Sequence, residues 1–483
     1  MGRENDTNTI EKNTIEETIT FPKKAKIAFS DFLSYLSQKT VIFASSIITF
    51  IFVCLEIYNV ADFQDIYYAF AMATVFALPA TLLSEKLSTL KKYFTQILVA
   101  TAGGFIGYFS KSNGFGNHVY SELYYFGIAF SVISASLFLF IPKKNPRTYF
   151  AGIFKHFLFC SFMSLIVLGG SSLLVYAVQN LILNTEDYDI YLCCVGFSTI
   201  VFALNSFTFY LFNRREEESS GKAFKVIVLY IMLPAFTLLV AILYAYLAKA
   251  LILFKLPSGQ INWFVSFASC FYIVFYFILR EYDELPVIRV FYKFGAFIFI
   301  PLICIQIPAY FIRINSYGFT GWRYSSLLFI IFSILTIALT FVKKGQFTKY
   351  SLLILTALIL FDSLSPFNLI NMAYKSQYSR LIKVMEKYDL YDRENDALTN
   401  YDRKKLEKTI TDEDRDTIAS SYNYIVNTSR LPNPKWATDE KKSTSFDKVF
   451  GIQRYHDKEK RKNLNGKRPT ELLKLNRSKK CAR

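Results

Sequence analysis

Residues 324–342 read YSSLLFIIFSILTIALTFV, nineteen residues without one charged side chain. A helix of this length rises about 28 Å, close to the hydrocarbon core of a bilayer, which is about 30 Å thick. The stretch lacks the strict alternation of polar and apolar residues that a membrane β-strand requires. It therefore predicts a transmembrane helix.

Similar apolar stretches recur along much of the chain, which is 53% hydrophobic and holds 49 Phe and 33 Tyr. The further predicted spans are 41–58, 66–83, 93–110, 122–141, 152–182, 190–212, 224–254, 262–279, 290–312 and 350–369. The predicted fold class is an all-α membrane protein. It is a polytopic bundle of about eleven transmembrane helices with a small, mainly helical C-terminal soluble domain.

Positive charge alternates between the loops that join these spans. The even-numbered loops carry sixteen Lys and Arg residues, whereas the odd-numbered loops carry four. Because positively charged loops stay in the cytoplasm, the even-numbered loops are predicted to be cytoplasmic. The N-terminus is then inside, and eleven crossings place the C-terminal domain outside. The predicted location is the inner (plasma) membrane, with that domain extracytoplasmic (periplasmic).

The expected domain organisation follows from these spans and from a change of composition near residue 370. We expect a polar cytoplasmic segment (1–38), the bundle (39–369), a small extracytoplasmic helical domain (370–434) and a basic, disordered tail (435–483). In the third part, Thr411 precedes three acidic residues and predicts a helix N-cap. Ile418, Tyr422 and Ile425 follow at helical spacing.

Composition and motifs exclude several function classes. The formal charge of +17 lies mainly in short loops and in the tail, so we expect no nucleic-acid partner. Six of the seven cysteines lie in apolar spans, no C-x-x-C occurs, and the three histidines are far apart. We therefore expect no metal site, disulfide framework or cofactor. No P-loop, nucleophile elbow or H-E-x-x-H is present, so whether the chain is an enzyme stays open.

Several short motifs occur between residues 225 and 430. They are Leu233-Pro234, Tyr244-Ala-Tyr246, Leu256-Pro257-Ser258-Gly259 with Trp263, the segment from Arg313 to Tyr324, Ser365-Pro366-Phe367, and Ser376-Gln377-Tyr-Ser-Arg380-Leu381. Together they resemble a bacterial family of multi-pass membrane proteins, the domain of unknown function 4153. The resemblance implies a multi-pass protein with a small C-terminal soluble part. It implies no activity.

The segment RINSYGFTGWRY (313–324) gives the strongest candidate site. Its two arginines offer planar forks for a carboxylate or phosphate, and its glycines permit tight turns. We expect an outward-facing anion site, made by Lys249, Arg313, Tyr317, Arg323, Tyr324 and Asp362. Ionisable residues within spans usually face the bundle interior. The same residues would also serve as anchors at the lipid headgroups, with Asp362 pairing with an arginine.

A weaker alternative is the pair Asp62 and Asp65 in the first outer loop. This arrangement resembles that of the large polytopic lipid-linked glycosyltransferases, which place catalytic carboxylates in their first outer loop. The loop here is short, and a solvated turn that caps the second span explains both residues equally.

Three function classes follow. The first is binding or transport of an anionic solute or lipid headgroup at the outward-facing site. The second is a lipid-linked glycosyl or acyl transferase of the cell envelope, and the third is a non-catalytic envelope scaffold. The expected partners are membrane lipids and an anionic solute or lipid-linked glycan. The oligomeric state stays open.

Polar and small residues inside the spans have two readings. His156, Asn205 and Gln306 would line a polar path or form interhelical hydrogen bonds. Gly103-x-x-x-Gly107 and the run Gly169-Gly170-Ser171-Ser172 predict surfaces for close helix packing.

Overall fold

The computed structural model describes Ser30, Ser34 and residues 39–60, 62–112, 114–116, 118–141, 149–180, 187–213, 221–252, 260–342, 347–428, 431–437 and 449–450. The predicted N-terminal segment and most of the basic tail lie outside these residues. The chain divides into two compact units, each described separately below. Unit 1 comprises Met1–Phe236, Tyr272–Lys293 and Lys343–Ile359, and unit 2 comprises Thr237–Phe271, Phe294–Val342 and Leu360–Arg483.

The regular secondary structure in the described residues of unit 1 is helical. Its helices are α3 (Thr40–Ile57), α4 (Gln64–Leu83), α5 (Thr89–Ser112), α6 (Ser121–Phe140), α7 (Tyr149–Val178), α8 (Asp189–Gly196), α9 (Leu204–Asn213) and α10 (Lys222–Val226). A π-helical segment, Phe197–Ala203, joins α8 to α9 into one rod, and Ile227–Met232 does the same after α10. The end of α12 (Gln260–Ile278), the start of α13 (Pro286–Tyr317) and most of α15 (Phe347–Leu364) complete the unit.

Unit 2 contains the whole or the remaining part of the later helices and a small hairpin. The helices that lie wholly or partly in it are α11 (Leu233–Ile252), α12 (Gln260–Ile278), α13 (Pro286–Tyr317), α14 (Gly321–Val342), α15 (Phe347–Leu364), α16 (Leu369–Lys387), α17 (Arg403–Thr409) and α18 (Asp412–Asn423). Strands β1 (Tyr391–Asp392) and β2 (Ala397–Leu398) pair antiparallel, with Tyr391 opposite Leu398. The acidic turn between them is held by Asp392, which accepts from the backbone of Glu394.

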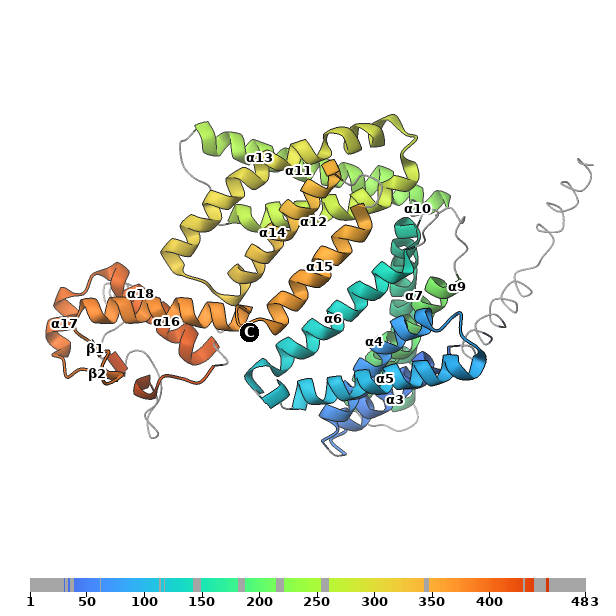
Figure 1. The fold of residues 1–483 in the computed structure, drawn as a ribbon, viewed down its shortest axis with the longest axis horizontal. Helices are drawn as coiled ribbons and strands as arrows, with labels where there is room; N and C mark the ends of the chain where they lie inside the picture. Colours follow the sequence, from blue (N-terminus) through green and yellow to red (C-terminus); the bar gives the residue numbers. More distant parts are fainter. Residues whose placement is uncertain are drawn as a thin grey trace, which may run out of the picture. The chain divides into compact units, whose positions relative to one another are not determined.

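Nine of the described helices are long and apolar enough to cross a membrane, and a tenth counts if α15 and α16 form one span bent by 55° (Figure 1). This multi-pass helical architecture confirms the predicted fold class. The predicted span 93–110 does form a helix, α5, but α5 is not among the nine. Three lysines and Gln96 make its sequence less apolar than those of its neighbours.

The C-terminal helices build a hydrophobic core of their own within unit 2. Its buried residues are Leu381, Ile382, Met385, Leu390, Leu406, Ile410, Ile418, Ala419, Tyr422, Ile425, Ala437 and Phe450. Thr411 caps α18 by accepting a hydrogen bond from the Asp414 amide, which confirms the cap predicted from sequence. The core includes Ala437 and Phe450, which lie beyond the predicted domain end at residue 434.

Most of the polar side chains singled out from the spans form contacts between helices. Asn205 donates to the Ser46 hydroxyl at 2.9 Å, and Gln306 donates to the Ser266 hydroxyl at 3.0 Å. His156 stacks on Tyr210, with ring centroids 4.4 Å apart. These contacts favour interhelical bonding over a polar path.

The two small-residue motifs predicted to pack closely differ in what surrounds them. A Cβ on Gly103 would lie 2.5 Å from the Cβ of Phe76, so α4 and α5 pack as closely as predicted. A Cβ on Gly169 or Gly170 would meet no described atom within 4 Å. The packing predicted for that second motif is therefore wrong among the described residues, because this face of α7 is open.

Gly103→Ala should lower the thermal unfolding midpoint of the protein in detergent. The added methyl overlaps Phe76, and overpacking of this kind costs about 1–3 kcal/mol. Gly169→Ala is the matched control and should leave the midpoint unchanged or slightly raised, because the methyl enters open space. Equal midpoints for the two variants would contradict the close α4–α5 contact.

Candidate functional site

The turn between α13 and α14 is built around Gly318. Helix α13 ends at Tyr317, and the Gly318 amide donates to the Ile314 carbonyl at 2.7 Å. Gly318 has φ +67°, and a Cβ there would lie 2.8 Å from the Gln377 amide nitrogen. Both the backbone conformation and the neighbouring side chain therefore require glycine.

Arg323 stabilises this turn from the first turn of α14. Its Nη1 donates to the carbonyl oxygens of Tyr317, at 3.1 Å, and Gly318, at 2.8 Å. These groups end α13, so the guanidinium satisfies them and complements the negative end of the helix dipole. The Tyr310 hydroxyl donates to the Arg323 carbonyl at 2.8 Å and joins the two helices again.

The buried side chain of Gln377 on α16 holds the same turn from the other side. Its amide nitrogen donates to the Tyr317 carbonyl at 2.9 Å and to the Phe319 carbonyl at 2.7 Å. Its oxygen accepts from Ser421 of α18 at 2.9 Å. The neighbouring Ser376 hydroxyl accepts from the Phe319 amide. We call Ser376 and Gln377 the clamp.

Two further contacts link the C-terminal helices to the turn. Arg380 donates to the Ser316 carbonyl at 2.5 Å and to the Thr417 hydroxyl at 3.1 Å. The Gly321 amide donates to the Tyr424 hydroxyl at 3.2 Å. The domain built on α16 and α18 is thus hydrogen-bonded to the turn at several points.

Asp414 fastens α18 to the end of α16. Its carboxylate accepts from Lys387 at 2.6 Å, Tyr388 at 2.7 Å and Thr411 at 2.8 Å. Partial burial alone would raise the pKa of Asp414, but these hydrogen bonds outweigh it and hold the pKa below its ordinary value of 3.8. The charged form is therefore favoured in the folded domain.

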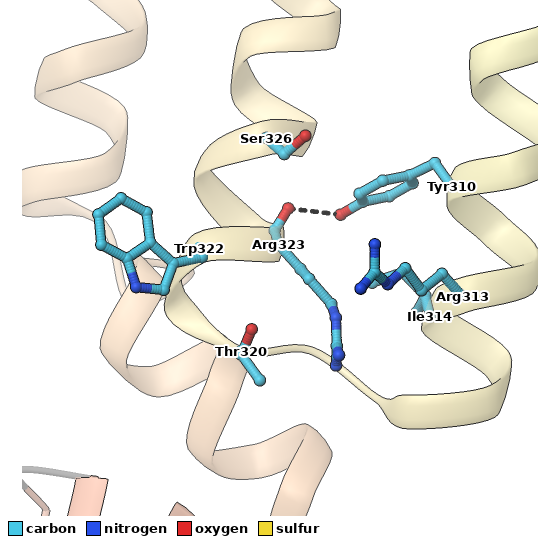
Figure 2. A pocket seen from close by; sticks show the side chains of 7 residues that line it. All are labelled: Tyr310, Arg313, Ile314, Thr320, Trp322, Arg323 and Ser326. Atoms are coloured by element: carbon cyan, nitrogen blue, oxygen red, sulfur yellow. Dashed lines mark hydrogen bonds between the residues drawn. The ribbon is translucent and has the colours of Figure 1, made fainter. Parts of the chain in front are cut away.

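A pocket of about 390 Å³ lies between the ends of α13 and α14 (Figure 2). It is lined by Tyr310, Arg313, Ile314, Thr320, Trp322, Arg323 and Ser326. Figure 2 shows the guanidinium groups of Arg313 and Arg323 entering the same space from the two helices. Trp322, which is 75% exposed, lies on the side of α14 that faces away from the two guanidinium groups.

Arg313 differs from the other two arginines near the turn. Arg323 and Arg380 donate hydrogen bonds to backbone carbonyls. Arg313 makes no hydrogen bond or ion pair with any residue that the structure describes. None of the three forms an ion pair within 4 Å with a described carboxylate. The pocket therefore presents positive charge and unused donors.

The other residues of the predicted anion site lie outside the pocket lining. Tyr317 faces Arg323, whose guanidinium carbon is 5.5 Å from its ring centre. Tyr324 is buried, and its hydroxyl donates to the Phe367 carbonyl. Asp362 accepts from the Leu369 amide at 2.9 Å and so supports the start of α16. Lys249 is exposed on α11.

Asp62 and Asp65 lie in unit 1 at the start of α4. Asp62 is exposed and accepts from the Gln64 amide at 3.3 Å, and Asp65 belongs to the first turn of the helix. Both positions are typical of acidic residues that stabilise a helix N-terminus.

The sequence of this chain matches a known protein family. The profile of the domain of unknown function 4153 (DUF4153) matches residues 45–402. The chain belongs to this family. The match begins earlier than the expected residue 225 and ends before α17, so that α18 and its contacts to the turn lie beyond the matched region. Searches of curated proteins and of solved structures found no significant match.

Within this DUF4153 protein, the sequence predicted the two arginines and the segment that holds Thr320 and Trp322. It did not predict Tyr310 and Ser326, which also line the pocket, or the clamp, which lies some sixty residues away in sequence. One feature of the sequence pointed to the clamp. Gln377 and Arg380 belong to a motif that carried the family resemblance, and the turn belongs to another.

Gln377→Leu should loosen the α13–α14 turn. The variant removes two donors and leaves the Phe319 carbonyl without its 2.7 Å partner, which for a buried group costs about 1–3 kcal/mol. Hydrogen exchange at the Phe319 and Gly321 amides should accelerate. Lys375→Leu, on the exposed side of α16, is the matched control. Unchanged exchange in Gln377→Leu would contradict the clamp.

The stability of the C-terminal domain should fall in acid through Asp414. Because the folded pKa lies below the unfolded value of 3.8, the contribution is complete above 3.8 and is lost as pH falls through the folded pKa. Hydrogen exchange of α18 between pH 6 and 2.5 measures this loss. Asp414→Asn should flatten the dependence, whereas Asp416→Asn, an exposed neighbour, should not. Parallel profiles for all three proteins would refute this role.

Proposed function

We propose that this multi-pass membrane protein binds a phosphate-bearing anion, a free solute or a lipid headgroup, in the Arg313–Arg323 pocket. The observation that carries the proposal is the Arg313 guanidinium, which has no described hydrogen-bond partner and faces a pocket beside a second arginine. Arginine forks match phosphate and carboxylate oxygens in a planar, bidentate geometry.

The different roles of Arg313 and Arg323 support this function. Arg323 is fixed by its hydrogen bonds to the Tyr317 and Gly318 carbonyls, which use one of its nitrogens. Its remaining donors make no hydrogen bond with a described residue and can meet an anion in a position that the turn determines. Such preorganisation lowers the entropy cost of binding.

Pocket size and position favour a headgroup-sized ligand. A pocket of about 390 Å³ admits a phosphate with a small substituent. The highly exposed Trp322 beside it is typical of the interface between hydrocarbon and water, where lipid phosphates lie. By the positive-inside rule we propose that the pocket opens on the outer face of the membrane.

Thiol labelling tests both the ligand and the side of the membrane. Ser326→Cys places a thiol in the pocket lining, and Ser325→Cys places one on the adjacent exposed position outside that lining. Both are made with Cys481→Ser and treated in intact spheroplasts with a membrane-impermeant thiol reagent. Inorganic phosphate should slow labelling at position 326 and leave position 325 unaffected.

Adding Arg313→Gln to the Ser326→Cys protein should weaken this phosphate protection about tenfold or more, because a hydrogen bond to a charged group contributes about 1.5–3 kcal/mol. Arg289→Gln is the control. Protection that survives Arg313→Gln would overturn the proposed site. Labelling at position 326 that requires lysis would overturn its outward orientation.

A further inference from the structure

A long apolar groove lies on one face of unit 1 and is lined by residues of α3, α4 and α5. Figure 1 shows the ribbons of these three helices. Its volume is about 990 Å³, and its lining extends along α5 from Tyr93 to Phe109. At 1.5 Å per residue this length is about 24 Å, more than half of the hydrocarbon core. An acyl chain that enters at the Tyr93 end fits wholly within it.

The Ser45 hydroxyl, which lines the groove, is already satisfied by the protein. Ser45 donates to the Ile42 carbonyl at 3.1 Å and accepts from Thr74 at 2.9 Å. The groove therefore offers hydrocarbon contacts along most of its length. Tyr93 and Tyr108 stand near its two ends, as aromatic residues do at the two membrane interfaces.

Two lysines mark one end of the groove, which is formed by Thr40 and Tyr93. Lys39 and Lys92 are the residues directly before these two, and Lys92 acts electrostatically on Lys39. Lys39 is only 6% exposed, and its ammonium lies 4.2 Å from the ring centre of Phe212. No described carboxylate lies within 4 Å of it.

The described negative charge near this pair of lysines compensates it only in part. Burial lowers the pKa of Lys39, Lys92 lowers it further, and the opposing effect of Glu85 is smaller. An anion bound at this end of the groove would raise the pKa of Lys39 and favour its charged form. Phosphate is such an anion, and it stands at the head of a hydrocarbon chain in every phospholipid.

We infer that unit 1 holds an anionic phospholipid, with its phosphate at Lys39 and Lys92 and one acyl chain in the α3–α4–α5 groove. The site is separate from the Arg313 pocket and does not rest on the function proposed there. Charge complementarity at one end and apolar length along the rest together select this occupant. A zwitterionic lipid carries the same phosphate, but its ammonium group is repelled by the two lysines and offsets part of that attraction.

Native mass spectrometry of the full chain, titrated with phosphatidylglycerol or phosphatidylcholine, tests the inference. The wild-type protein should bind phosphatidylglycerol more tightly. Lys39→Gln and Lys92→Gln should each weaken that binding about fivefold, the effect of one charge near an anionic headgroup. Lys91→Gln, at an exposed neighbouring position, should not. Should Lys39→Gln fail to fold, the partly exposed Lys92 carries the charge test.

Thr101→Trp tests the groove itself, because Thr101 lines it and the adjacent exposed Ala102 does not. Thr101→Trp should abolish the selective binding, and Ala102→Trp should retain it. Equal affinity for the two lipids, or equal binding by the two tryptophan variants, would overturn the inference. So would a dimer that Thr101→Trp disrupts whether or not lipid is present, since the groove would then hold a second copy of the chain.

Discussion

The side-chain amide of Gln377 is the contact on which the arrangement of the candidate site depends. It lies 3% exposed between the α13–α14 turn and α18, and each of its polar atoms is hydrogen-bonded. A buried amide so satisfied fixes both partners, since moving either one leaves a polar group without a partner in a region of low dielectric. It thereby links the C-terminal core to the ends of two apolar helices.

That constraint separates the roles of the three nearby arginines. Arg323 and Arg380 donate to backbone carbonyls at the end of α13, so they help to hold the turn. Arg313 lies one helical turn before that end and makes no hydrogen bond or ion pair with any residue that the structure describes. A fixed turn with one unused guanidinium beside a pocket is an arrangement suited to recognising an anion, and we regard the C-terminal domain as the element that maintains it.

How much was predictable from sequence depends on whether the signal was local. The apolar stretches predicted the helices because length and hydropathy are local properties, and Thr411 with its acidic neighbours predicted the α18 cap for the same reason. The Gln377 clamp joins residues some sixty positions apart, and nothing in either segment alone indicates the other. Asp362 illustrates the same limit: its role at the start of α16 depends on the sharp bend after α15.

An experimental structure of the protein in a lipid nanodisc, with tungstate as a dense phosphate analogue, tests the central claim most directly. The account predicts tungstate within hydrogen-bond distance of the Arg313 guanidinium, beside an Arg323 still bonded to the Tyr317 and Gly318 carbonyls. A carboxylate of the chain paired with Arg313, in a pocket that excludes tungstate, would contradict it.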